Sequence, residues 1–252
     1  MSCLGSLLRK IGKRELFDLM TSQIENNEKA EVTEYFNGTG FDRWNRIYSE
    51  SDDVNNVQKN IRIGHQKTVD DVLVWLKEYD NIKDRSFCDV GCGVGSLSIP
   101  LAKLGAKSID LSDISKAMIT ETKKRAKEAG LKFNQLNFQV SDLENLKGSF
   151  NTVICLDVFI HYPQKEAEKM VKHLCELSDE RLIVSFAPYT PLLALLKGIG
   201  QLFPGPSKTT RAYTLKEQGI IAAANQSGFK VVKSKLNQAP FYFSKLIEFV
   251  KT

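Results

Sequence analysis

Seven residues, Asp89 to Gly95, are the part of this 252-residue sequence best suited to chemistry, because an acid precedes three glycines at alternate positions. A short apolar run that predicts a buried strand leads into them, and residues 96–104 predict a helix. Glycine lets the backbone turn tightly and lets a ligand approach closely, because no Cβ intervenes. A helix N-terminus points free N–H groups at such a ligand. The stretch therefore predicts a nucleotide-binding turn between a strand and a helix.

The residues around the glycines discriminate between ligands. Asp89 ends the predicted strand, where a carboxylate suits a positive amino group and repels a pyrophosphate. A dinucleotide site also needs a glycine or alanine where Leu97 and Ser98 stand. The D-x-G-x-G-x-G run resembles the first motif of class I S-adenosylmethionine (SAM) methyltransferases; a tight turn without a ligand and a nicotinamide site are the alternatives. The resemblance implies SAM contacts from Asp89, Gly91, Cys92, Gly93 and Gly95.

Two more acids follow predicted strands, at residues 107–111 and 137–140. Asp113 lies about twenty residues past the glycine turn, where a βαβ unit places a carboxylate on a ribose diol. A charge partner for the following helix is the alternative. Asp142 is expected to accept the amino hydrogens of adenine, with the capping of a short helix as its alternative. The predicted cofactor site also includes their neighbours, Ile114 and Leu143.

Asp157 and His161 follow the predicted strand at residues 152–156. Ligands of open α/β sheets bind at the carboxyl ends of the strands, so both side chains should face one crevice. Asp157 is predicted to bind the cofactor and His161 to act in catalysis, unless it is a loop histidine bonded to a nearby carbonyl. His65 and His173 lie on helical stretches and are assigned structural roles.

The order of elements predicts the fold. From residue 85, predicted strands and helices alternate, which is typical of a doubly wound, mostly parallel, Rossmann-like α/β sheet, here seven-stranded. Residues 229–235 and 241–250 read as two strands without room for a helix between them, which predicts a terminal antiparallel hairpin. Residues 85–252 are thus expected to form the SAM-binding core.

The residues before the core predict a helical lid. Residues 31–84 place Tyr35, Trp44 and Tyr48 on a glycine-hinged segment, which can close over a site or simply form a satellite core. Residues 1–30 are an N-terminal extension. Its first 14 residues alternate apolar and basic side chains, as a membrane-contacting helix or a frayed terminus does.

A long insertion, residues 187–213, interrupts the predicted core. Connections in α/β domains usually take a few residues, so a long apolar one at the binding edge predicts a cap over a large hydrophobic ligand. Lys208 and Arg211 suit an anionic group on that ligand. A dimer contact or a membrane-facing patch is the alternative.

Composition narrows the partners. The net charge of +5 is too diffuse to argue for nucleic acid, yet fits an acidic substrate or an anionic membrane surface. The five cysteines contain no C-x-x-C pair and indicate neither a disulfide framework nor a zinc site, so no protein-bound metal is expected.

From about residue 34 to 243 the sequence resembles the magnesium protoporphyrin IX methyltransferase family of chlorophyll biosynthesis, most specifically in H-Y-P and F-P-G-P-S-K-T-T-R-A-Y. The resemblance implies methyl transfer from SAM to a propionate of Mg-protoporphyrin IX. His161 would orient the propionate, and Tyr48 would donate a hydrogen bond to it. The porphyrin would be bound by Lys208, Arg211, Tyr35 and Trp44.

The resemblance also implies a location in the cell. We expect the protein in the cytoplasm of a photosynthetic bacterium or in the plastid stroma, with peripheral contact to the photosynthetic membrane. Contact with the porphyrin-carrying subunit of magnesium chelatase is expected as well. Two other functions stay open: another small-molecule SAM-dependent methyltransferase, or a non-catalytic SAM or porphyrin carrier.

Overall fold

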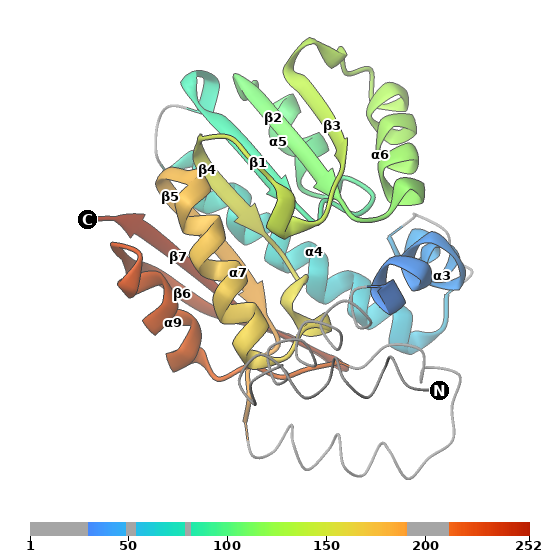
Figure 1. Cartoon of the computed structure of the whole chain (residues 1–252). Coiled ribbons are helices and arrows are strands. Elements are labelled where there is room, and N and C mark those ends of the chain that lie inside the picture. Colours follow the sequence, from blue (N-terminus) through green and yellow to red (C-terminus); the bar gives the residue numbers. More distant parts are fainter. Residues whose placement is uncertain (1–29, 49–53, 79–81, 191–211) are drawn as a thin grey trace, which may run out of the picture.

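A seven-stranded sheet organises the computed structural model, which describes residues 30–48, 54–78, 82–190 and 212–252 (Figure 1). The strand order is β3-β2-β1-β4-β5-β7-β6. Strand β7 runs antiparallel to both of its neighbours, and the other pairings are parallel. The strands are β1 (Ser86–Val90), β2 (Ser108–Asp113), β3 (Leu136–Val140), β4 (Phe150–Cys155), β5 (Ser178–Phe186), β6 (Phe229–Ala239) and β7 (Tyr242–Lys251). The predicted fold class and the terminal hairpin are confirmed.

Helices cover both faces of this sheet, as a parallel sheet requires (Figure 1). Residues 30–37 are helical and precede α3. The α-helices with assigned bounds are α3 (Thr39–Ile47), α4 (Asn56–Lys77), α5 (Ser98–Lys103), α6 (Lys116–Glu128), α7 (Gln164–Leu177) and α9 (Glu217–Gln226). Short 3₁₀ turns are η1 (Ile82–Asp84), η2 (Phe133–Gln135), η3 (Leu143–Asn145) and η4 (Phe159–His161).

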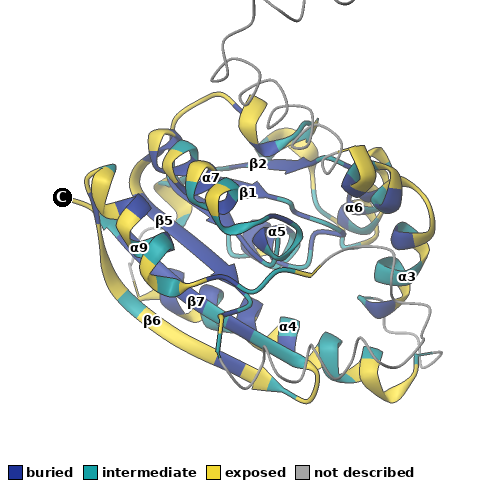
Figure 2. Ribbon diagram, turned by 60° about the horizontal axis from the view of Figure 1, so that its bottom comes forward, coloured by how far each residue is buried: buried dark blue, intermediate teal, exposed yellow. Residues whose placement is uncertain are grey.

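The alternation of side chains along each strand divides the interior into two cores. Phe87 and Ile109 point to one face, where they pack with apolar residues of α4, α5 and α6. Cys88 and Val90 point to the other face, toward α7 and α9. The strands in the middle of the sheet are therefore buried on both sides, whereas the outer surfaces of the helices are exposed (Figure 2).

Local signals explain where the site-forming helices begin. Asn55 caps α4 through a capping box with Gln58. Ser115 caps α6, because its side chain accepts the Met118 N–H at 3.2 Å. Pro163 precedes α7, which spans the residues that its pattern predicts.

The N-terminal segment packs over the carboxyl edge of the sheet, with α3 against α4 and α6. Arg125 of α6 donates to the backbone carbonyl of Tyr48 at 2.7 Å and to the side chain of Asn45 at 2.6 Å. Ser115 donates to the Phe36 carbonyl at 2.8 Å. The segment is thus fastened to the helix that follows β2.

Of the predicted cap, residues 191–211 lie outside the described residues, and Lys208 and Arg211 lie among them. Its two ends are described and lie together. Tyr189 donates to the Leu215 carbonyl at 2.7 Å, and Tyr213 donates to the Ile160 carbonyl at 2.7 Å. The insertion therefore leaves and re-enters the fold beside the turn that carries His161.

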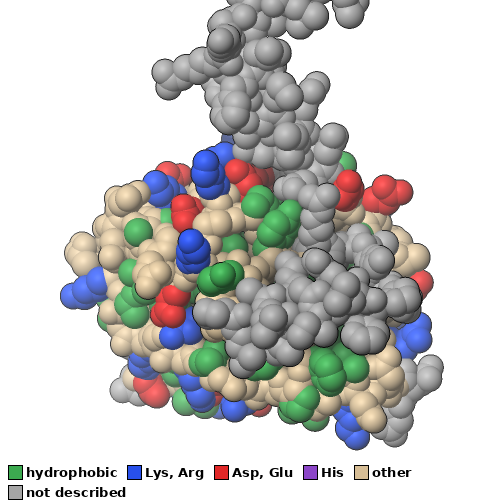
Figure 3. Space-filling model, turned by 90° about the horizontal axis from the view of Figure 1, so that it is seen from below, with side chains coloured by type: hydrophobic (Ala, Val, Ile, Leu, Met, Phe, Trp, Pro, Cys, Tyr) green, Lys and Arg blue, Asp and Glu red, His purple; other side chains and the backbone are tan. Residues whose placement is uncertain are grey.

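Within the described part of the chain, no helix combines the length and apolarity needed to cross a membrane. Seen from below the carboxyl edge, the side chains outside the grey atoms mix hydrophobic groups with charges of both signs (Figure 3).

Candidate active site

The glycine turn after β1 needs glycine for conformation and for space. Gly91 and Gly93 have φ values of 73° and 53°, in the left-handed region that favours glycine. A Cβ on Gly91 would lie 2.2 Å from Cγ2 of Val158, whereas a Cβ on Gly93 would meet nothing within 4 Å. The turn is therefore packed on the side of β4 and open at its middle glycine, where a ligand can approach the backbone.

Two buried carboxylates flank this turn. Asp89 accepts a hydrogen bond from the Ser98 hydroxyl, yet burial raises the pKa of Asp89 to about 6. Asp113 accepts the N–H groups of Gly93 at 3.0 Å and Ser115 at 2.8 Å, and burial raises the pKa of Asp113 to about 6 as well. Two buried carboxyl groups thus lie at the carboxyl ends of β1 and β2, one on each side of the glycine turn.

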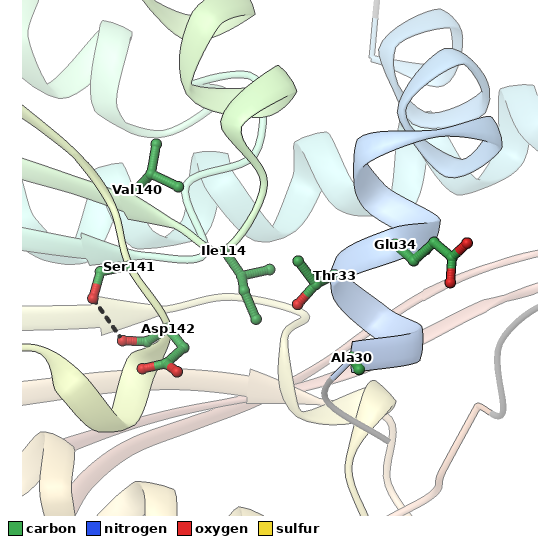
Figure 4. A pocket seen from close by; sticks show the side chains of 7 residues that line it. All are labelled: Ala30, Thr33, Glu34, Ile114, Val140, Ser141 and Asp142. Atoms are coloured by element: carbon green, nitrogen blue, oxygen red, sulfur yellow. Dashed lines mark hydrogen bonds between the residues drawn. The ribbon is translucent and has the colours of Figure 1, made fainter. Parts of the chain in front are cut away.

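A shallow pocket of about 580 Å³ continues the site from the ends of β2 and β3 to the N-terminal segment (Figure 4). Ile114 and Thr33 point toward one another across it, while Glu34 points away. Asp142 lines this pocket and also accepts the Asn145 N–H at 3.0 Å, so the helix cap weighed as an alternative is present. Leu143 is buried beside it.

Asp157 has the most hydrogen bonds of the predicted site residues. Its φ of 57° is left-handed, a strained conformation for a residue with a Cβ. Four donors from three other elements reach its carboxylate: Ser185 Oγ at 2.7 Å, Ser244 Oγ at 3.0 Å, Tyr242 OH at 2.7 Å and His65 Nδ1 at 3.0 Å.

Those donors determine the charge state of Asp157. Burial alone would raise the pKa of this carboxyl, but the hydrogen bonds and the charge of His65 outweigh it and lower the pKa. Four donors also occupy the acceptor positions of both oxygens. Any cofactor contact from this residue is therefore left to its backbone.

His161 lies one turn further along, on η4. Burial lowers the pKa of its imidazole to about 4, although the charge of Asp157 acts in the opposite direction. Its Nδ1 is buried without a hydrogen-bond partner among the described residues, and its ring contacts Phe36 edge-on at 5.1 Å. A neutral imidazole with an unpaired buried nitrogen is suited to a polar ligand group.

The aromatic residues predicted for the lid occupy different positions. Trp44 and Tyr48 stack at 5.5 Å, and Tyr48 meets the ring of His65 at 4.5 Å. Burial and the charge of Asp157 raise the pKa of Tyr48 well above its usual value, so its phenol keeps its proton. Tyr35 is buried, and its ring meets that of Phe36 edge-on at a centroid distance of 5.1 Å.

The sequence pattern indicates none of the four partners of Asp157. His65 is expected only to support its helix, and Ser185, Tyr242 and Ser244 are expected only as parts of strands. A weak signal existed, because Gly64 and Thr68 put small residues on the otherwise apolar buried face of α4. Thr68 and Tyr242 hydroxyls lie 3.0 Å apart.

The described residues contain no group of three or more His, Cys, Asp or Glu side chains that could hold a metal ion.

The strand order, the glycine turn and the acid at the end of β2 define a class I SAM-dependent methyltransferase. A Methyltransferase domain model matches residues 87–179, and a putative RNA methyltransferase structure from Pyrococcus horikoshii shares the fold at 15% identity and a TM-score of 0.55.

Closer relatives specify the family. A model described as the magnesium-protoporphyrin IX methyltransferase C-terminus matches residues 155–251. The magnesium-protoporphyrin O-methyltransferase of Synechocystis is 51% identical over 90% of this chain and 97% of its own length. The chloroplastic magnesium protoporphyrin IX methyltransferase of Arabidopsis thaliana is 49% identical, over 92% of this chain and 74% of its own length. The chain belongs to the magnesium protoporphyrin IX methyltransferase family.

A solved structure supports the same assignment. The crystal structure of magnesium protoporphyrin IX methyltransferase from Synechocystis, with bound SAH, matches 89% of this chain and 100% of its own with a TM-score of 0.83 and 50% identity. A second Synechocystis structure of that enzyme, with bound SAM, matches with a TM-score of 0.79. The protein is a SAM-dependent methyltransferase.

Proposed function

We propose that this protein transfers the methyl group of SAM to one propionate of Mg-protoporphyrin IX, giving the monomethyl ester and S-adenosylhomocysteine. The observation that carries the proposal is the 51% identity over 97% of a relative named for this activity. In the site itself, the unpaired Nδ1 of His161 supports it, because a buried polar atom gains most from a ligand partner.

The proposed reaction requires little proton transfer by the protein. A propionate has a pKa near that of glutamate, about 4.3, so it is already a nucleophile at neutral pH. SAM supplies an electrophilic methyl on a sulfonium: a carboxylate O–CH₃ bond forms, the S–CH₃ bond breaks, and its electron pair stays on sulfur. Because opposite charges cancel in this step, excluding water favours it.

His161 and Tyr48 are proposed to hold the acceptor. The imidazole of His161 is neutral at physiological pH, so one of its nitrogens carries a hydrogen that can be donated to a carboxylate oxygen. Tyr48 keeps its phenolic proton for the same use. Both groups lie close enough to Asp157 for its charge to act on their pKa values. The pair orients the carboxylate without removing a proton from it.

The cofactor is proposed to lie along the carboxyl ends of β1, β2 and β3. Asp89 faces the amino group of SAM, Asp113 the ribose diol, and the backbone of the glycine turn the amino acid end. Ile114, Asp142 and Leu143 surround adenine. The open space at Gly93 and the pocket beside Ile114 support this fit.

The lid and the cap are proposed to enclose the porphyrin. Residues 31–84 are the lid on the core of residues 85–252, and residues 187–213 are the cap, with Lys208 and Arg211 for the propionates. The joined ends of the cap beside Ile160 support this role, because the insertion then starts and finishes at the acceptor side. Arg211→Ala should raise the half-saturating porphyrin concentration without changing SAM affinity.

The test of the function is a methyl-transfer assay with Mg-protoporphyrin IX beside metal-free protoporphyrin and a quinone precursor. We expect the monomethyl ester and S-adenosylhomocysteine in equal amounts from the magnesium porphyrin. Methylation of the quinone precursor alone would overturn the proposal in favour of another small-molecule methyltransferase. Binding of SAM and porphyrin without product would leave a carrier.

The setting is proposed from the family. The Arabidopsis relative is chloroplastic and the Synechocystis relative is cyanobacterial, which supports the plastid stroma or a bacterial cytoplasm near the photosynthetic membrane. Contact with the membrane and with the porphyrin-carrying subunit of magnesium chelatase can be tested by co-sedimentation of the purified full chain. Vesicles with anionic lipid and the purified subunit are the two probes.

A further inference from the structure

His65 connects the buried carboxylate of Asp157 with the aromatic residues of the N-terminal segment. Resting on the proposed function, we propose that His65 is a positioning residue of the acceptor site: its ring, which is hydrogen-bonded to Asp157, holds the ring of Tyr48 in place. It does so from α4, an element that contributes no other residue to the proposed cofactor or acceptor contacts.

The hydrogen bond to Asp157 fixes the imidazole. Nδ1 of His65 lies 3.0 Å from Oδ2 of Asp157, and a carboxylate can only accept, so Nδ1 carries the hydrogen. Both side chains are largely buried, at 12% and 15% exposure. Asp157 is itself held by Ser185, Ser244 and Tyr242 from β5 and β7. The ring of His65 is therefore tied to the sheet rather than only to its own helix.

The other side of His65 supports an aromatic stack. The ring of Tyr48 lies 4.5 Å from that of His65 at an interplanar angle of 38°, and 5.5 Å from that of Trp44 at 27°. Tyr48 is thus held between one ring of its own segment and one ring that is fixed to the sheet. Aromatic contacts of this kind have preferred geometries, so His65 restricts where the Tyr48 hydroxyl can lie.

The backbone of Tyr48 is held as well, but from another direction. Arg125 donates to its carbonyl at 2.7 Å, which fixes the main chain and leaves the ring to its neighbours. If the ring of Tyr48 rotated out of this position, its hydroxyl would move away from a bound carboxylate. Small misplacements of this kind lower the rate of catalysis strongly. Removing the ring of His65 should therefore affect turnover more than substrate or cofactor binding.

Two variants of His65 separate its two contacts. His65→Asn keeps an N–H close to the position of Nδ1, and so keeps the bond to Asp157, but loses the ring. His65→Phe keeps a ring and loses that bond. Each is assayed as the full chain for kcat and KM with Mg-protoporphyrin IX, for SAM affinity by calorimetry, and again in a Tyr48→Phe background.

We expect His65→Asn to lower kcat about tenfold while SAM affinity stays within about twofold, which also shows that the variant is folded. His65→Phe should lower kcat as well. In the Tyr48→Phe background the effect of His65→Asn should shrink to about twofold or less, because the two residues then share one function. His173→Asn, a matched change on α7, should leave kcat unchanged.

Unchanged kcat in either His65 variant would overturn the inference, and so would full additivity of His65→Asn with Tyr48→Phe. A loss of SAM affinity in His65→Asn equal to the loss of activity would overturn it too, because His65 would then support the fold alone. A wild type that fails to methylate Mg-protoporphyrin IX would overturn the proposed function and this inference together, whereas an active wild type isolates the role of His65.

Discussion

The two halves of the site are built in different ways. In the half proposed to bind the cofactor, at the ends of β1 and β2, Ser98 contacts Asp89 across 9 residues of sequence, and Gly93 contacts Asp113 across 20. In the half proposed to bind the acceptor, at the end of β4, His65 and Tyr242 reach Asp157 across 92 and 85 residues. One half forms within a single βαβ unit, and the other exists only when distant elements have packed.

This difference predicts which substitutions mainly impair ligand binding and which mainly impair stability. A carboxylate in a local unit can be removed while most of the fold persists, because its neighbours are held by the strand and helix on either side. A carboxylate that joins α4, β5 and β7 is part of what holds them together. Losing it leaves several buried donors without an acceptor, each at a cost of roughly 1–3 kcal/mol.

The largest effect is expected at Asp157. Asp157→Ala should lower the free energy of unfolding by about 3–5 kcal/mol, because His65, Tyr242, Ser185 and Ser244 lose their common acceptor. Urea unfolding followed by circular dichroism measures it. Asp110→Ala, on β2, is the control and should cost less. A loss below about 1 kcal/mol at Asp157 would remove the contrast between the halves.

In the cofactor half, Asp113→Ala should weaken SAM binding by about 1.5–3 kcal/mol, the range of hydrogen bonds to charged groups. It should lower the free energy of unfolding less than Asp157→Ala does, because two N–H groups rather than four donors lose their acceptor. Calorimetric titration gives the affinity. Asp110→Ala serves again as control, since Asp110 lies on the same strand and bonds Asn137 at 2.8 Å instead. Unchanged SAM affinity in folded Asp113→Ala would remove the ribose assignment.

SAM affinity should also depend on pH. The pKa of Asp89 is raised to about 6, so below that pH the carboxyl gains a proton and loses its attraction for the amino group of SAM. Binding should be about tenfold weaker at pH 5 than at pH 7.5, about 1.4 kcal/mol. Asp89→Asn should bind weakly and with a shallower profile, because only Asp113, whose pKa is also raised to about 6, still gains a proton in this range. A wild-type profile no steeper than that of Asp89→Asn would contradict the prediction.

The smallest effect is expected at Arg125, which joins α6 to Tyr48 of the acceptor half. Arg125→Met removes the bonds from α6 to Tyr48 and Asn45, and should raise KM for the porphyrin about fivefold, or about 1 kcal/mol, without changing SAM affinity. Steady-state kinetics measures it. The neighbouring Lys124→Met changes an exposed cation and is the control. Equal changes in KM for both variants would mean that the loss of a positive charge, and not the loss of these hydrogen bonds, raises KM.

The cofactor half is also the half that sequence could predict. The spacing from the glycine turn to Asp113 follows from the length of a strand, a helix and a second strand, so the pattern alone brings them together. The edge strands were less well bounded. Strand β6 extends to Ala239 rather than residue 235, because pairing with β7 continues to the hairpin where Ala239 faces Tyr242.

The acceptor half could be predicted only in part. The position of His161 at the end of β4 follows from topology, but the periodicity of α4 shows which residues are buried and not what they contact. His65 was therefore assigned to the fold alone, although it bonds Asp157. Lys208 and Arg211 stay predictions, since they lie outside the described residues.

The packing of α4 on β7 has a consequence for variation among related enzymes. Gly64 meets the ring of Tyr242 so closely that a Cβ there would lie 2.3 Å from Cδ1 and 2.9 Å from Cβ of the tyrosine. Any larger residue at position 64 must displace the ring that donates to Asp157. We therefore expect the two positions to covary among related enzymes, with glycine at position 64 wherever tyrosine stands at position 242. The residue at this position of α4 would then depend on the residue of β7 that donates to Asp157.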